Sequence, residues 1–255
     1  MSAKDKLRKF QENETFRCLF QPATEEVLRK DYRLKGAWNR EVFRNDHPII
    51  LELGCGKGEY TISLAEKFPD TNFIGIDIKG ARLWKGAKYV EEHRLQNAAF
   101  IRTRIEFIES LFAPNEIAGI WITFPDPQIK KARKRLTSVP FLNRYKNFLV
   151  PDGIVHLKTD SRFLHEYTAA LALRNRLTVL DACTDIYGTA KADEILSIRT
   201  FYETYFLSKG FPITYLRFRI DNTEPLAEPQ WDEKYWEKEE MKGRESNPSN
   251  KGCPA

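Results

Sequence analysis

Short apolar runs alternate with longer amphipathic segments along most of the chain. Seven of these runs have the length and composition of buried strands, and they cover residues 48–53, 71–77, 98–102, 117–123, 153–159, 177–182 and 213–220. Five amphipathic segments between them have a helical pattern, near residues 57–68, 80–95, 138–149, 161–175 and 201–209. This alternation indicates βαβ units, in which helices cover both faces of a mostly parallel sheet. The pattern therefore predicts an α/β fold with a seven-stranded sheet.

The first predicted strand ends in the sequence LELGCGKGEY, which places Glu52 two residues before Gly54. In an open α/β sheet, ligands bind beyond the carboxyl ends of the strands. Gly54, Gly56 and Gly58 allow a tight turn there and a close approach of a ligand to the backbone. Their G-x-G-x-G spacing differs from the G-x-G-x-x-G of dinucleotide-binding loops, and Glu52 would repel a pyrophosphate. Glu52 could instead accept a hydrogen bond from a ligand amine. The alternative for the glycines is a purely structural role in the turn.

Asp77 closes the second predicted strand, 23 residues after Gly54. A carboxylate at this place can receive both hydroxyls of a ribose, whereas the alternative role is to cap the next helix. Glu52, the glycines and Asp77 together resemble the S-adenosylmethionine loop of class I methyltransferases. That resemblance implies a Rossmann-like class I methyltransferase fold and S-adenosyl-L-methionine as cofactor.

The fourth predicted strand is followed by the sequence FPDPQIKKARKRL. Pro125 and Pro127 fix their own φ angles and push the residues before them out of the helical region, so Asp126 has little backbone freedom. Five cations follow in six residues, namely Lys130, Lys131, Arg133, Lys134 and Arg135. So dense a cluster suits contacts to the phosphates of a nucleic acid. The alternatives are a buried turn aspartate that bonds nearby N–H groups and, for the cations, a solvated loop.

The charge distribution also favours a polyanionic partner. Residues 221–255 contain nine acids and five bases, a net charge of −4, so residues 1–220 carry +9 within the total of +5. We divide the chain into an N-terminal extension (1–45), a catalytic domain (46–220) and an acidic tail (221–255) that we expect to be partly disordered.

Composition restricts the cellular context. The content of 42% hydrophobic and 30% charged residues is ordinary for a globular protein, and the apolar runs are too short to span a membrane. The N-terminus has no apolar signal segment, and the four cysteines lack metal-ligand spacing. We therefore expect a cytoplasmic protein without a metal or a membrane partner, as a monomer or homodimer.

The sequence FPDPQIKKARKRL resembles the FPDPW-x-K-K-R-H-x-K-R-R-L signature of the bacterial tRNA (guanine-N7)-methyltransferases. The segments LELGCGKGEY, KTDS at 158–161 and TFYE at 200–203 match further motifs of this family. The resemblance runs from about residue 48 to residue 220. It implies transfer of a methyl group from S-adenosylmethionine to N7 of a guanine in the variable loop of tRNA.

The resemblance also implies roles for individual residues. Asp126 would be the catalytic acid. The cofactor would be bound by Glu52, Gly54, Gly56, Asp77, Arg104 and Asp126. The substrate would be bound by Lys130, Asp160, Thr200 and Glu203. The tRNA phosphates would be contacted by Lys131, Arg133, Lys134 and Arg135.

Some positions depart from the family pattern or have a second interpretation. Gln128 stands where the family has tryptophan. Arg104 and Ile105 lie near the position at which the family usually has an Asp-Ala pair after the third strand. Thr200-x-x-Glu203 is also a capping box, and Asp160 could cap the helix that follows it. Competing functions are methylation of another nucleobase atom, NAD-dependent oxidation and RNA binding without catalysis.

Overall fold

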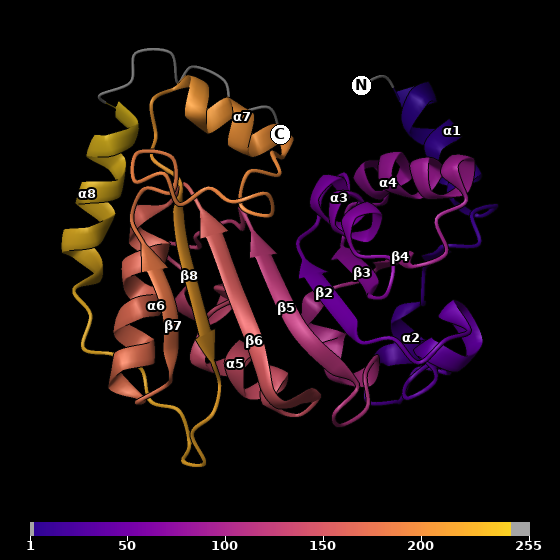
Figure 1. Cartoon of the computed structure of the whole chain (residues 1–255), viewed down its shortest axis with the longest axis horizontal. Helices are drawn as coiled ribbons and strands as arrows, with labels where there is room; N and C mark the ends of the chain where they lie inside the picture. The colour runs from indigo at the N-terminus through magenta and orange to yellow at the C-terminus, as the bar shows by residue number, and fades with distance from the viewer. Residues whose placement is uncertain (1–2, 246–255) are drawn as a thin grey trace. The chain divides into compact units, whose positions relative to one another are not determined.

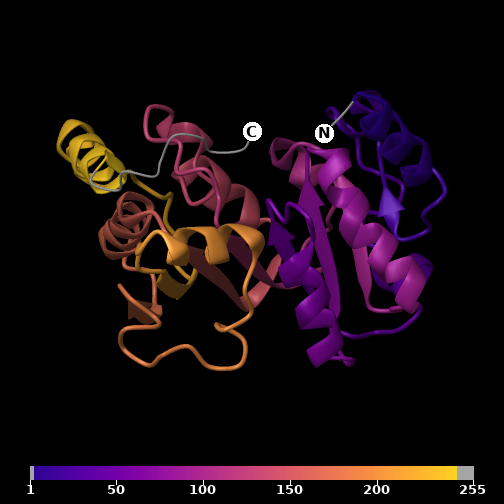
Figure 2. The ribbon, with the colours of Figure 1, turned by 90° about the horizontal axis from the view of Figure 1, so that it is seen from above.

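The computed structural model describes residues 3–245, which form two compact units. The first unit contains the chain up to Thr123 together with Asn143–Val155. The second unit contains Phe124–Leu142 and the chain from His156 onwards. Figures 1 and 2 show the helices and strands of both units. The predicted catalytic domain, residues 46–220, therefore contributes to both units.

The first unit contains most of the parallel sheet. Its strands lie in the order β1-β4-β3-β2-β5-β6. Their bounds are β1 (Leu19–Phe20), β2 (Ile49–Leu53), β3 (Asn72–Asp77), β4 (Ala98–Arg102), β5 (Ile117–Thr123) and β6 (Leu149–Thr159), the last of which continues into the second unit. The chain runs outward from β2 through β3 to β4 and then returns to β5 on the other side of β2. The strand order therefore reverses between β2 and β5, and this reversal is where such sheets bind ligands.

The helices of the first unit accompany these strands. They are α1 (Ala3–Asn13), α2 (Thr24–Val27), α3 (Glu59–Lys67), α4 (Gly80–His93), the π-helix Trp38–Phe43 and the 3-10 helix Ile105–Ser110. Helix α5 (Val139–Lys146) contains residues of both units. In Figure 1, α1 lies beside α4.

In the second unit, the end of β6 and two further strands lie in the order β6-β8-β7. Strands β7 (Val179–Cys183) and β8 (Thr214–Arg219) pair in antiparallel fashion. The helices of this unit are α6 (Arg162–Arg174), α7 (Phe201–Ser208), α8 (Glu233–Glu245) and the 3-10 helix Ala132–Lys134. Helix α8 packs beside α6, as Figure 1 shows.

Each unit has its own apolar core. In the first unit, Leu51 and Ile74 of the central strands are fully buried, as expected for strands covered on both faces. In the second unit, Phe163 of α6 and Phe218 of β8 are fully buried. Trp38 fixes the N-terminal segment, because its buried indole N–H donates to the carbonyl of Leu111 at 2.9 Å.

The α/β fold predicted from the sequence is confirmed, and the sheet formed by the described residues 3–245 has eight strands instead of seven. The additional strand, β1, has only two residues and pairs with β4, so it leaves no apolar run to recognise. Strand β6 begins at Leu149, four residues before the predicted start, because Pro151 and Gly153 lie inside the strand. Within the predicted acidic tail, Glu233–Glu245 form α8, and residues 246–255 lie outside the described residues.

Candidate active site

The glycine-rich loop after β2 contains three left-handed residues, with φ of +77° at Gly54, +57° at Gly56 and +74° at Gly58. A Cβ at Gly58 would lie 2.6 Å from the ring of Phe100, so this position requires glycine for packing. A Cβ at Gly56 would meet nothing within 4 Å. The bare backbone of Gly56 therefore borders open space, as expected of a loop that a ligand approaches closely.

Asp77, at the end of β3, holds this loop in place. Its Oδ2 accepts a hydrogen bond from the backbone N–H of Gly56 at 2.9 Å, and its Oδ1 accepts one from Lys79 at 2.7 Å. The residue is 9% exposed, and each carboxylate oxygen retains a second lone pair. The capping residue of α4 is Lys79, so the predicted alternative for Asp77 is wrong. The next side chain, Ile78, is 56% exposed.

Glu52 of β2 is buried, with only 3% of its surface exposed. Its Oε2 accepts hydrogen bonds from the backbone N–H of Thr61 at 2.8 Å and from the Thr61 hydroxyl, and its Oε1 accepts one from the Thr123 hydroxyl at 2.5 Å. Burial raises the pKa of Glu52 to about 7, although these hydrogen bonds act in the opposite direction. The carboxylate thus joins β2 to α3 and to the end of β5, on both sides of the strand-order reversal.

Arg104 lies just beyond β4, at the start of the 3-10 helix Ile105–Ser110. Its side chain is exposed, and its Nη2 donates to the Glu106 carboxylate at 3.2 Å. A ligand that binds the Arg104 guanidinium would therefore compete with the Glu106 carboxylate for it.

The turn after β5 presents Asp126 to solvent. Phe124 has φ of +48°, which is uncommon for an aromatic residue, and its N–H donates to the carbonyl of Lys158 at 2.9 Å. The Asp126 carboxylate accepts a hydrogen bond from the backbone N–H of Gln128 at 3.0 Å. The sequence predicts a conformationally restricted turn, and the structure shows a strained backbone at Phe124 in this turn. Strained residues of this kind are found at functional sites.

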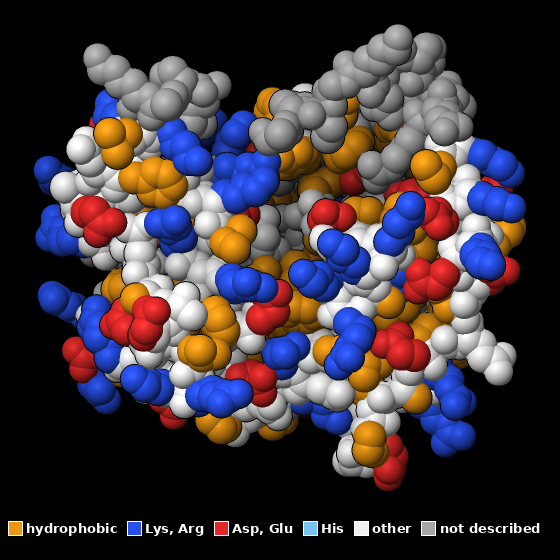
Figure 3. Space-filling model, turned by 180° about the vertical axis from the view of Figure 1, so that it is seen from behind, with side chains coloured by type: hydrophobic (Ala, Val, Ile, Leu, Met, Phe, Trp, Pro, Cys, Tyr) orange, Lys and Arg blue, Asp and Glu red, His pale blue; other side chains and the backbone are white. Residues whose placement is uncertain are grey.

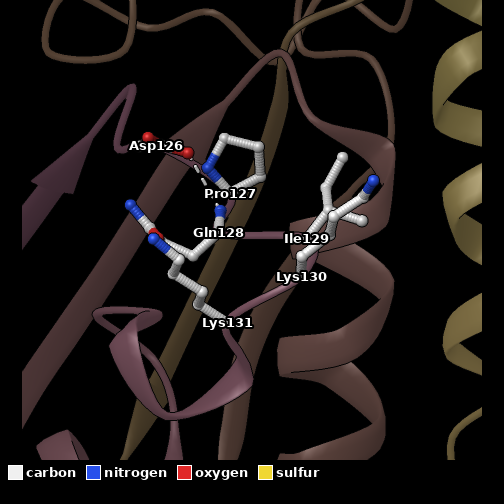
Figure 4. A pocket seen from close by; sticks show the side chains of 6 residues that line it. All are labelled: Asp126, Pro127, Gln128, Ile129, Lys130 and Lys131. Atoms are coloured by element: carbon white, nitrogen blue, oxygen red, sulfur yellow. Dashed lines mark hydrogen bonds between the residues drawn. The ribbon is translucent and has the colours of Figure 1, made fainter.

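Asp126 lines a shallow hollow with a volume of about 370 Å³. Figure 4 shows its lining side chains, which are Asp126, Pro127, Gln128, Ile129, Lys130 and Lys131. Lys130 and Lys131 extend in different directions from the turn (Figure 4). One exposed acidic residue and two lysines thus line one hollow, which suits a ligand that has both hydrogen-bond donors and negative charge.

The five cations after this turn have different surroundings. Three of them, Lys131, Arg133 and Lys134, are exposed and are called the exposed loop cations below. Lys130 is also exposed, and its ammonium lies 3.2 Å from the Glu237 carboxylate of α8. On the face shown in Figure 3, lysines and arginines are interspersed with aspartates and glutamates.

Arg135 does not fit its predicted contact with phosphate, because its side chain has no exposed surface. Its guanidinium lies over the rings of Phe163 at 4.6 Å and Tyr167 at 4.4 Å. Its Nη2 donates to the carbonyl of Ile129 and to the Glu233 carboxylate of α8, each at 2.9 Å. Arg135 therefore fixes the loop to the body of the second unit.

The T-x-x-E motif is only partly a capping box. The Thr200 hydroxyl caps α7 by accepting a hydrogen bond from the N–H of Glu203 at 3.1 Å. The Glu203 side chain is instead fully buried, and its carboxylate lies 2.8 Å from the ammonium of Lys158. At the preceding motif, Ser161 caps α6, and Asp160 is half-buried at the end of β6.

The structure thus separates the predicted site residues into two groups. Glu52, Gly54, Gly56, Asp77 and Arg104 lie in the first unit, and the remaining predicted residues lie in the second. Sequence reasoning missed Thr61 and Thr123, the partners of Glu52, because two isolated threonines give no local signal. It also missed Lys158 as the partner of Glu203, although this lysine stands directly before the predicted T-D motif.

The described part of the chain sets two further limits. Within residues 3–245, no helix is both long and apolar enough to cross a bilayer. In the same residues, no group of three or more histidine, cysteine or acidic side chains is arranged to hold a metal ion.

Residues 46–216 match a family model described as "Putative methyltransferase". A tRNA (guanine-N(7)-)-methyltransferase of Christiangramia forsetii is 56% identical over 223 residues, which are 86% of this chain and 100% of the relative. A tRNA (guanine-N(7)-)-methyltransferase of Bacteroides thetaiotaomicron is 48% identical over 226 residues, which are 89% of this chain and 90% of the relative.

Solved structures support the fold. The 16S rRNA methyltransferase KamB superposes with a TM-score of 0.55 at 14% identity, over 70% of this chain and 90% of that one. At this identity the likeness concerns the arrangement of helices and strands alone. The predicted class I methyltransferase fold is confirmed.

Proposed function

The chain belongs to the family of tRNA (guanine-N(7)-)-methyltransferases, and from this premise we propose that it transfers a methyl group from S-adenosylmethionine to N7 of a guanine in the variable loop of tRNA. The observation that carries this proposal is the Asp126 turn, in which an exposed, conformationally restricted carboxylate stands next to exposed cations. Its chemistry suits a purine that gains positive charge during methylation and is attached to a phosphate backbone.

The residues beyond β2 and β3 fit the cofactor. Gly56 borders open space. The Asp77 carboxylate retains lone pairs that can accept hydrogen bonds from the two hydroxyls of a ribose. Glu52 supports this site indirectly, because Thr61 and Thr123 already occupy its carboxylate. When bound, S-adenosylmethionine supplies a methyl group activated by its sulfonium.

Methylation of guanine N7 does not require a general base. N7 has a free lone pair at neutral pH and loses no proton when it forms the new bond. The purine becomes positively charged, and the Asp126 carboxylate can stabilise that charge or accept hydrogen bonds from the N1–H and the N2 amine. Positioning and electrostatics then supply most of the catalysis.

The cations around Asp126 hold the RNA backbone in this proposal. Lys130 and the exposed loop cations contact phosphates, which fixes the register of the tRNA without reading its sequence. Asp160 and Thr200 would complete the guanine site. The target nucleotide must leave its stacked position, at a cost of a few kcal/mol.

The experiment that tests this function is methyl transfer from labelled S-adenosylmethionine to unmodified tRNA, followed by nucleoside analysis and mapping of the modified position. We expect 7-methylguanosine in the variable loop. A tRNA with adenosine in place of that guanosine serves as the control and should accept no label. Label on another atom, such as an exocyclic amine, would overturn the proposal.

A further inference from the structure

A fully buried ion pair in the second unit joins β6 to α7. The ammonium of Lys158 lies 2.8 Å from the carboxylate of Glu203, and neither side chain has exposed surface. The same ammonium donates hydrogen bonds to the carbonyls of Leu196 at 2.6 Å and Ile198 at 3.0 Å. Glu203 also accepts a hydrogen bond from the hydroxyl of Tyr187 at 2.7 Å. The three N–H donors of Lys158 therefore meet three acceptors.

Burial makes each partner of this pair dependent on the other. A charge inside a protein loses its hydration, and removing its partner leaves that loss uncompensated. Desolvation lowers the pKa of Lys158, and the carboxylate of Glu203 acts in the opposite direction. The position of Glu203 is thus set by Lys158 and Tyr187.

Lys158 also holds the Asp126 turn, through its backbone. Its carbonyl accepts the hydrogen bond from Phe124 at 2.9 Å, and its ammonium lies 6.0 Å from the centroid of the Phe124 ring. Through its side chain, Lys158 fixes the segment that leads to Thr200, the capping residue of α7. Two segments that contribute to the proposed guanine site are therefore attached to one residue.

We propose that Lys158 is a positioning residue for methyl transfer, and that Glu203 is its buried partner instead of a direct contact to guanine. This inference rests on the proposed function. To bind a guanine edge, Glu203 would have to leave its pairing with Lys158 and Tyr187. Asp126 is already exposed and needs no such rearrangement.

A double-mutant cycle separates the two roles of Glu203, with kcat and KM for tRNA measured for Lys158→Met, Glu203→Gln and the double variant. We expect Lys158→Met to lower kcat/KM about tenfold or more, the size of couplings within one buried network. The double variant should be about tenfold more active than Lys158→Met, because glutamine removes the unpaired charge. If Glu203 binds guanine directly, the double variant will be no more active than Lys158→Met, and the inference is overturned.

A matched control distinguishes positioning from stability. Phe218→Leu removes buried volume from β8 in the same unit, at a residue outside the predicted site. All variants are assayed well below their melting temperatures, where we expect Phe218→Leu to keep the kcat and KM of the wild type. If Lys158→Met also keeps both values, its role is only structural and the inference fails.

Glu203→Gln alone keeps the test decisive if Lys158→Met does not fold. Without the carboxylate, Lys158 can lose its proton, because desolvation already lowers its pKa. Glutamine can then accept a hydrogen bond from the amine and donate one to the Tyr187 hydroxyl, so we expect kcat/KM within about fivefold of the wild type. A loss of 100-fold or more with unchanged melting temperature would assign Glu203 to guanine. Wild-type protein that forms no 7-methylguanosine would refute the proposed function itself, which the cycle does not test.

Discussion

Glu52→Gln should change how the stability of the protein depends on pH. The carboxylate is buried, and its folded-state pKa is raised from 4.5 to about 7. Glutamine preserves the shape and the local hydrogen bonds, because its oxygen can accept from Thr61 and its amide can donate to the Thr123 hydroxyl. The substitution therefore removes the titration with little other change.

The sign follows from proton binding. Between pH 4.5 and 7 the folded protein holds a proton on Glu52 that the unfolded chain has released, so the wild type loses stability as the pH rises through this window. At 1.36 kcal/mol for each pH unit between the two pKa values, the loss is about 3 kcal/mol. Above pH 7 the Glu52 carboxylate is ionised in both the folded and the unfolded protein, so the wild type remains less stable by the full amount.

Urea unfolding at several pH values between 4.5 and 8 measures this effect. The free energy of unfolding of Glu52→Gln, relative to the wild type, should increase by about 3 kcal/mol across the window. Glu92→Gln, which removes a carboxylate that is 58% exposed, is the matched control and should change by less than about 0.5 kcal/mol. A difference between Glu52→Gln and wild type that does not vary with pH would refute the reasoning.

Three further predictions follow from the loop contacts. Gly58→Ala should lower the free energy of unfolding in urea by about 3 kcal/mol, whereas Gly56→Ala should lower it by about 1 kcal/mol. Gly56→Ala should also weaken the binding of S-adenosylmethionine, measured by calorimetry, about tenfold. Equal effects of the two substitutions on this binding would contradict the prediction. Arg135→Gln should lower the free energy of unfolding by about 2–3 kcal/mol. Glutamine at all three exposed loop cations should leave stability nearly unchanged, but it should reduce the slope of log K for tRNA binding against log salt concentration by about 2–3. An unchanged slope would exclude phosphate contacts at these residues. Glu237→Gln should increase tRNA affinity up to about fivefold by releasing Lys130 from a surface ion pair, and an affinity that falls would show that α8 assists binding.

The apolar pattern determined most of the fold because buried strands need continuous apolar runs. The predicted strand at 98–102 coincides with β4, and the one at 117–123 coincides with β5. The two-residue strand β1 was missed because its pairing with β4 depends on a neighbour far along the chain. Residues 149–152 of β6 lie outside the predicted strand at 153–159, since neither Pro151 nor Gly153 favours a strand interior.

The site was predictable where local sequence determines local geometry. The two prolines around Asp126 indicated a restricted turn, and the T-x-x-E spacing placed the start of α7 at Thr200. Burial of charged side chains was not predictable. Arg135 and Glu203 are buried because aromatic rings and Lys158 reach them from distant parts of the chain, and no spacing within their own motifs reports those partners.

The central claim is that the Asp126 carboxylate stabilises the methyl-transfer transition state, and the single-turnover rate of Asp126→Asn tests it most directly. Saturating S-adenosylmethionine and unmodified tRNA remove binding from the measured rate. We predict a rate at least about 100-fold below the wild type, with both binding affinities within about threefold. A rate within about threefold of the wild type would contradict the account.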